Sequence, residues 1–217
     1  MHADARAVQD RPTDIEDLAE TTSAPTPESK SIGSRTVDGI RIRYADSGSP
    51  AEQSIVLTSP WPESVYALQI WPSLAKSFRL FAVDLPGFGG SEGSDELISP
   101  HAMGEFLIRL IDEFQLGNPH LVGPDVGTSA ALFAAASPPG LLSSVVVGSG
   151  GAAVPIQLGG ALEQWVLAPD SKLAILNAGH FVWEEAAGSY PSIIADWVSD
   201  GYLDAHGSAR ATVNGGE

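Results

Sequence analysis

Hydrophobic positions along the chain form short runs that are separated by longer stretches of mixed polarity. Five such runs cover residues 54–59, 79–84, 120–123, 143–149 and 172–177. Short runs with few polar interruptions are typical of parallel strands that are buried on both faces of a sheet. We therefore predict five buried parallel strands.

The stretches between these runs have helical spacing. We predict helices over residues 63–76, 100–116 and 126–136. One face of the second carries Met103, Phe106, Leu107, Leu110, Ile111 and Phe114. Upstream, apolar and charged residues alternate after an Asp38-Gly39 pair, which predicts a β-hairpin. The alternation of strand and helix predicts a doubly wound, mostly parallel α/β sheet, whose ligands bind beyond the carboxyl ends of the strands.

The length of 217 residues favours one globular domain. Residues 1–30 contain seven acids and no aromatic residue, so we expect them to form a disordered acidic tail. We place the folded domain at 31–205 and a flexible C-terminal tail at 206–217.

Charge and cysteine content narrow the classes of function. The chain has 11 Lys and Arg against 27 Asp and Glu, and its formal charge of -16 repels nucleic acid and anionic membranes. The absence of cysteine excludes disulfides, a thiolate nucleophile and cysteine-bearing zinc sites. We find no pattern of a secretory signal and no uninterrupted apolar stretch long enough to span a membrane. We expect a soluble, cytoplasmic protein.

The segment from His120 to Phe133 carries the most informative motif. A strand leads into Gly123-Pro-Asp125-Val-Gly127, and a helix follows. This pattern resembles the nucleophile elbow of the α/β-hydrolase fold, a sharp turn that presents a nucleophile at the start of a helix. The resemblance points to the branch with an Asp nucleophile, the haloalkane and haloacid dehalogenases and epoxide hydrolases, and so implies that Asp125 attacks an electrophilic carbon. A simple N-cap is the alternative role of Asp125.

Two further motifs extend the resemblance. Residues 59–64, SPWPES, stand where the family has HGxP, which implies that the backbone N–H groups of Trp61 and Val126 form an oxyanion hole. Ser59-Pro60 replaces the family's His-Gly, and the Trp61 side chain could instead be a core aromatic. Residues 84–91, DLPGFGGS, match a turn of the family in which Asp84 braces the loop. Many dehalogenases have Trp directly after the nucleophile, where this chain has Val126.

The last motif is Gly179-His180-Phe181, which matches the family's segment after its final strand. The match implies that His180 activates the water that hydrolyses the alkyl-enzyme ester. A structural histidine at a strand end is the alternative. The resemblance implies no cofactor and no metal.

Two parts of the family pattern are missing. Only residues 150–171 separate the last two predicted strands, too few for the family's helical cap and the strand with the acid that orients the histidine. We therefore predict that the strand at 172–177 fills the vacancy and brings His180 about 4.8 Å, one strand spacing, closer to Asp125. Glu184 and Glu185 could replace the missing acid, or could simply favour the start of a helix.

These observations predict a hydrolase that acts on a small electrophile, an epoxide or an organohalide, through an ester on Asp125. Trp61 and Trp165 are the candidate substrate-binding residues. The alternative is a truncated, non-catalytic member of the family that serves as a binding module. A serine esterase is disfavoured because Asp125 occupies the elbow and Ser129 lies inside the helix. Without a cap, we expect the apolar surface around Trp61 and Trp165 to favour self-association into a homo-oligomer.

Overall fold

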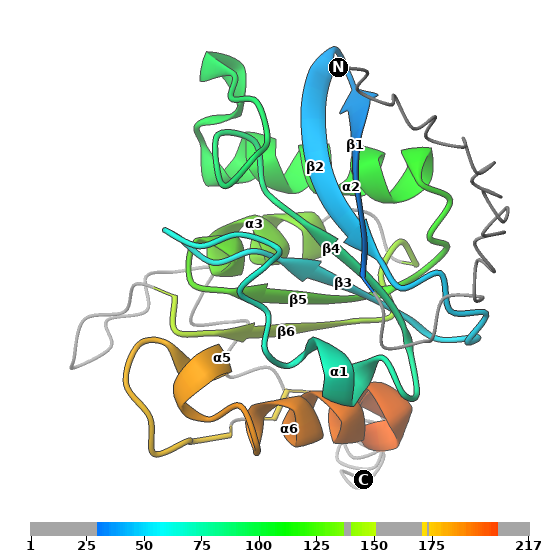
Figure 1. Ribbon diagram of the computed structural model, residues 1–217, viewed down its shortest axis with the longest axis vertical. Helices are drawn as coiled ribbons and strands as arrows, with labels where there is room; N and C mark the ends of the chain where they lie inside the picture. Colours follow the sequence, from blue (N-terminus) through cyan, green and yellow to red (C-terminus); the bar gives the residue numbers. More distant parts are fainter. Residues whose placement is uncertain (1–29, 137–139, 151–170, 173, 204–217) are drawn as a thin grey trace, which may run out of the picture.

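The computed structural model describes residues 30–136, 140–150, 171–172 and 174–203. These residues form an α/β domain around one six-stranded sheet with the order β1-β2-β4-β3-β5-β6 (Figure 1). The predicted tails, at 1–30 and 206–217, lie outside the described residues except for Lys30.

The sheet is mixed, with an antiparallel edge on a parallel core. Strands β2 and β4 are antiparallel, as are β1 and β2, whereas β3 pairs in parallel with β4 and β5, and β5 pairs in parallel with β6. The strands are β1 (Ser31–Val37), β2 (Ile40–Asp46), β3 (Ser54–Thr58), β4 (Arg79–Val83), β5 (His120–Pro124) and β6 (Ser144–Gly148). Four of the five predicted parallel strands and the hairpin are confirmed.

The hairpin turns at the predicted pair of residues. Asp38 and Gly39 have positive φ angles of 50° and 82°, and Val37 pairs directly with Ile40. A two-residue turn of this kind requires positive φ at both positions, which explains the Asp-Gly sequence.

Helices cover both faces of the sheet (Figure 1). Helices α2 and α3 lie on one face, and α1 and α6 lie on the other. The helical elements are α1 (Trp71–Leu74), η1 (Asp95–Leu97), α2 (Pro100–Glu113), α3 (Val126–Ala135), α5 (Val182–Glu185), α6 (Tyr190–Asp196) and the π-helix η2 (Trp197–Gly201). The predicted doubly wound arrangement is thus confirmed.

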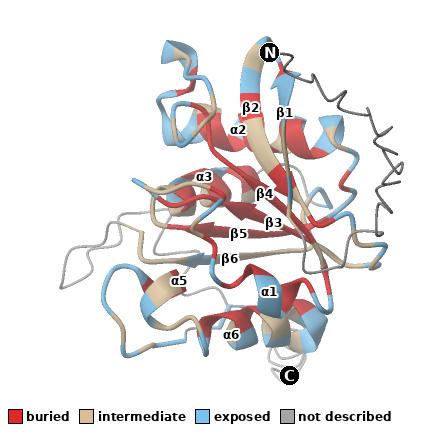
Figure 2. Cartoon of the chain, viewed as in Figure 1, coloured by how far each residue is buried: buried red, intermediate tan, exposed pale blue. Residues whose placement is uncertain are grey.

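Alternate residues of the central strands face opposite layers of the core. Ile55 and Leu57 of β3 pack with Trp71 and Ile194, whereas Val56 packs with Phe106 on the other face. All six are almost completely buried, and the buried residues run through the centre of the sheet in Figure 2. Burial of both faces explains why β3 reads as a continuous apolar run.

The prediction of a helix over residues 63–76 is largely wrong. Only Trp71–Leu74 are helical. The N–H of Val65 donates to the side chain of Asp84 instead of to a backbone carbonyl of a helix. The spacing of apolar residues reflected burial against the core, since Val65, Leu68 and Ile70 are buried without forming a helix.

The prediction of a strand over residues 172–177 is also wrong. The described residues of this segment form no strand, and the side chain of Ile175 is 87% exposed. A strand needs a neighbouring backbone edge as well as suitable side chains, and propensity reports only the side chains. The segment therefore reaches His180 as an irregular connection.

None of the described helices combines the length and the apolar character needed to cross a membrane.

Candidate active site

Asp125 lies on a sharp turn between β5 and α3. Its backbone has φ 51° and ψ −120°, a conformation that residues other than glycine rarely adopt. The N–H of Asp125 donates to the carbonyl of Gly148 at 3.0 Å, and its own carbonyl accepts from the N–H of Thr128 at 3.0 Å. The Asp125 side chain makes no capping hydrogen bond to α3, so the N-cap alternative is wrong.

The two glycines of the motif allow α3 to approach the sheet closely. A Cβ atom on Gly127 would lie 1.9 Å from Oγ1 of Thr58, and one on Gly123 would lie 2.5 Å from the carbonyl oxygen of Gly127. A side chain at either position would therefore displace the helix from β3 and β5. Because α3 begins directly after Asp125, this packing also fixes the position of the carboxylate.

The Asp125 carboxylate binds one partner with each oxygen. Its Oδ1 lies 3.1 Å from Nε2 of His180, and its Oδ2 accepts a hydrogen bond of 2.8 Å from the N–H of Trp61. The Asp125 side chain is only 11% exposed, whereas that of His180 is 50% exposed. Three segments that are far apart in the sequence thus meet at one carboxylate.

The predicted oxyanion donors flank Asp125. Val126 is the first residue of α3 and directly follows Asp125. The N–H of Trp61 donates a hydrogen bond to the Asp125 carboxylate. The Trp61 side chain is 58% exposed, so its alternative role as a core aromatic is wrong. Trp165, the other candidate substrate-binding residue, lies outside the described residues.

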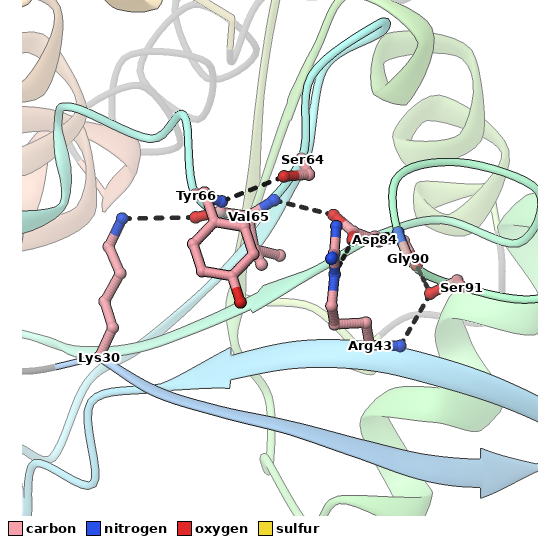
Figure 3. Close-up of polar contacts among 8 residues, drawn as sticks. All are labelled: Lys30, Arg43, Ser64, Val65, Tyr66, Asp84, Gly90 and Ser91. Atoms are coloured by element: carbon pink, nitrogen blue, oxygen red, sulfur yellow. Dashed lines mark hydrogen bonds and ion pairs between the residues drawn. The ribbon is translucent and has the colours of Figure 1, made fainter.

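A buried clamp around Asp84 holds the segment that carries Trp61 (Figure 3). Asp84 is fully buried and pairs with Nε of Arg43 at 2.5 Å. Its carboxylate also accepts from the N–H groups of Val65 and Gly90, each at 2.8 Å, and the Ser91 hydroxyl donates to its carbonyl at 2.7 Å. The prediction that Asp84 braces the loop is confirmed, and the clamp also ties residues 84–91 to the segment that follows Trp61.

His180 lies on a short segment that is held at the surface. Its ring meets the edges of Phe181 and Trp183 at centroid distances of 5.3 and 5.9 Å. The carboxylate of Glu185 accepts from the N–H groups of Gly179 at 2.8 Å and Phe181 at 3.3 Å. Glu185 therefore contacts the backbone on both sides of His180. The irregular connection brings His180 close to Asp125 without the strand that we predicted.

Sequence reasoning missed Glu63, which also faces this site. Its Oε2 accepts a hydrogen bond of 2.8 Å from the indole N–H of Trp183, which is fully buried. Burial raises the pKa of Glu63, and the nearby carboxylates of Glu184 and Asp125 raise it further. Glu63 belongs to the SPWPES motif, but no sequence signal indicates that its side chain turns toward Trp183.

A mostly apolar pocket of about 740 Å³, also lined by Asp95 and Ser129, adjoins the elbow. Val126 and Ala130 of α3 form part of its wall, and the remainder includes Leu85, Phe88, Leu97 and Met103. A ligand in this pocket would contact the residue that directly follows Asp125. Within the described part of the chain, no group of three or more His, Asp or Glu side chains could hold a metal ion.

Comparison with known proteins identifies the family. The sequence profile of the alpha/beta hydrolase fold matches residues 55–170, more than half of the chain. The chain therefore belongs to the alpha/beta hydrolase fold family.

Individual relatives match the chain over part of their length. The uncharacterized hydrolase YugF of Bacillus subtilis is 31% identical over 52% of this chain and 42% of its own length. The soluble epoxide hydrolase of Corynebacterium sp. strain C12 is 30% identical over 45% of this chain and 34% of its own length. A loop variant of the haloalkane dehalogenase DbeA from Bradyrhizobium elkanii superimposes with a TM-score of 0.50 and 28% identity, over 55% of this chain and 40% of its own. The aligned part of the chain thus spans less than half the length of each of these relatives.

Proposed function

We propose that this protein hydrolyses a small electrophilic substrate, an epoxide or an organohalide, through an ester formed on Asp125. One carboxylate oxygen of Asp125 attacks the electrophilic carbon and displaces the oxygen or halide bound to it. His180 then removes a proton from water, and the resulting hydroxide attacks the carbonyl carbon of the ester. Cleavage of the ester restores the Asp125 carboxylate.

The contact between Asp125 and His180 carries this proposal. Their side chains are 3.1 Å apart although 55 residues separate them in the sequence. Nε2 of His180 therefore lies where it can activate a water beside the ester carbonyl. The elbow conformation of Asp125 and the apolar pocket beside Val126 support the same interpretation.

The oxyanion donors act in the second step. When hydroxide adds to the ester, negative charge develops on the carbonyl oxygen derived from Asp125. The N–H of Trp61, which already binds Oδ2, stabilises that charge together with the N–H of Val126. The first step leaves Oδ2 as the carbonyl oxygen if Oδ1 is the attacking atom.

The relatives support the choice of substrates. One of them is named an epoxide hydrolase and another a haloalkane dehalogenase. Both names imply attack at a carbon that carries a leaving group, which suits a carboxylate nucleophile. The apolar wall of the pocket suits an uncharged organic substrate better than an anion, since the chain also has a formal charge of -16.

We expect ester hydrolysis to be the slow step. Within the described residues, the ring of His180 has no hydrogen bond to a carboxylate other than that of Asp125. Loss of the orienting acid from a comparable Ser-His-Asp triad lowers the rate about 10⁴-fold. The ester on Asp125 should therefore accumulate before it is hydrolysed.

Intact mass spectrometry tests this proposal. The protein is incubated with hexene oxide or hexyl bromide, and Asp125→Asn serves as the matched variant because its amide keeps the shape of the carboxylate. We expect an adduct on the wild-type chain that Asp125→Asn lacks, together with slow release of the diol or alcohol. A folded wild-type protein that gives neither adduct nor product would favour the non-catalytic alternative.

A further inference from the structure

Glu63 lies beside Trp183, the aromatic residue that packs against His180. It follows Trp61, whose N–H binds Asp125, by only two residues. The indole of Trp183 holds its carboxyl group at 2.8 Å, and the same indole ring packs against the ring of His180. Trp183 therefore links the Glu63 carboxyl group to the ring of His180, and the chain links Glu63 to the segment that binds Asp125.

Other acidic side chains lie near Glu63. The pKa of Glu63 is raised, first by burial and then by the charges of Glu184 and Asp125, while the N–H of Trp183 opposes the rise. Glu185, the other acid of α5, is engaged with the backbone on either side of His180. Burial and the neighbouring carboxylates therefore favour the protonated form of Glu63.

We propose that Glu63 is the general acid of this site and gives its proton to the oxygen that leaves carbon when Asp125 attacks an epoxide. The inference rests on the proposed function. In this step a bond forms between Asp125 and the epoxide carbon, and the bond between that carbon and the epoxide oxygen breaks. The oxygen takes the proton of Glu63 and becomes a hydroxyl group, which leaves Glu63 as a carboxylate.

The second step restores the proton. His180 takes a proton from water, hydroxide adds to the ester carbonyl, and the departing alkoxide takes the proton from His180. Asp125 is left as a carboxylic acid, and its proton passes to the Glu63 carboxylate. The cycle consumes one epoxide and one water, and it produces one diol.

This assignment distinguishes between the two substrate classes. An epoxide oxygen leaves as an alkoxide and gains from a proton donor, whereas a halide leaves as a stable anion that needs none. The single indole N–H of Trp183 is donated to Glu63. Its bond with Glu63 would have to break before that N–H could bind a halide. The site is therefore built for epoxides rather than organohalides.

The test compares the rate of ester formation with two probes that share one alkyl chain. Rapid quenching and intact mass spectrometry give this rate for hexene oxide and for hexyl bromide. Glu63→Gln should slow the reaction with hexene oxide by about 100-fold or more and leave that with hexyl bromide unchanged, because only the epoxide needs the proton. Glu105→Gln, on an exposed part of α2, is the matched control and should change neither rate.

A second variant, Glu184→Gln, keeps Glu63 in place and is tested through the pH dependence of the rate. The wild-type rate with hexene oxide should fall as pH rises through the pKa of Glu63. Glu184→Gln removes a negative neighbour, so the fall should move to lower pH. The rate with hexyl bromide should show no such fall in either protein.

Three outcomes would overturn the proposal. In the first, Glu63→Gln leaves the rate with hexene oxide unchanged. In the second, Glu63→Gln slows the reactions with both probes equally, as expected for a structural role. In the third, the wild type reacts with hexyl bromide alone. Each of these leaves the proposed function of Asp125 intact. If neither probe labelled the folded wild-type protein, the proposed function would fail and this inference with it.

Discussion

The two sides of the candidate site are held in place by different means. Asp125 and the segment of Trp61 rest on the central strands, on a close helix-to-sheet contact and on the fully buried Asp84. His180 lies on an irregular segment in which Phe181 is 38% exposed, and Glu185 holds its backbone from α5. Asp125 is thus positioned by the fold, and His180 by a few local contacts. Damage to the first side should unfold the domain, whereas damage to the second should impair one chemical step.

The largest effect should come from Asp84→Asn. The change leaves the Arg43 guanidinium without its carboxylate in a largely buried place, which costs about 3–5 kcal/mol of unfolding free energy. Urea denaturation measures the loss. The matched control is Asp46→Asn, whose ion pair with Arg79 is about one quarter to one third exposed and should contribute about 1 kcal/mol or less. Equal losses in the two variants would contradict the special role of the clamp.

Gly127→Ala should be the next most damaging change. The new methyl group would overlap Oγ1 of Thr58, and overpacking of this kind costs about 1–3 kcal/mol. Gly148→Ala is the matched control, because a Cβ atom there meets no atom within 4 Å. Adding Thr58→Ala to Gly127→Ala should recover part of the stability. A double variant no more stable than Gly127→Ala would show that the clash is not the cause.

Glu185→Ala tests the histidine side. The N–H groups on both sides of His180 lose their acceptor, so the ring should be less well placed to activate water. We expect ester hydrolysis to slow by up to about 100-fold, as for a misplacement of about 1 Å, while ester formation and the unfolding free energy change little. Time-resolved intact mass spectrometry separates the two steps. A variant that slows both steps equally would contradict the division between the two sides.

The smallest effect should come from a histidine at the opposite end of β5. His120 is buried, its Nδ1 lies 2.8 Å from the Ser144 hydroxyl, and burial lowers its pKa to about 4. The unfolded chain binds this proton near the ordinary value of about 6.5, so the stability due to neutral His120 is lost as pH falls from there toward 4. His120→Gln should therefore flatten the pH dependence of the urea midpoint in this range. An unchanged pH dependence would show that His120 does not contribute to it.

The same division separates what the sequence could predict from what it could not. The strands, the hairpin and the elbow depend on local sequence patterns. Gly123 and Gly127 belong to such a pattern, because a side chain at either position would prevent α3 from packing closely on the sheet. The bracing role of Asp84 in its own loop was also predictable from the glycine-rich turn after β4, whereas its bonds to Arg43 and Val65 were not.

The contacts around His180 depend on long-range packing that no local pattern encodes. The apolar residues 172–177 predicted a strand, yet whether a segment joins a sheet depends on which edge it reaches. The bond from Trp183 to Glu63 joins residues 120 positions apart, and it could not be inferred from either motif. The sequence motif did identify His180, but only the fold shows that its ring approaches Asp125 from an irregular segment.

Hydrolysis in water enriched in oxygen-18 tests the central claim most directly. The proposed mechanism places hydroxide on the carbonyl carbon of the ester, so one oxygen from water enters the Asp125 carboxyl group in each cycle. After several turnovers of hexene oxide, the peptide that contains Asp125 should carry the heavy isotope, and the same peptide from an incubation without substrate should not. Diol formed without any label in that peptide would contradict an ester on Asp125.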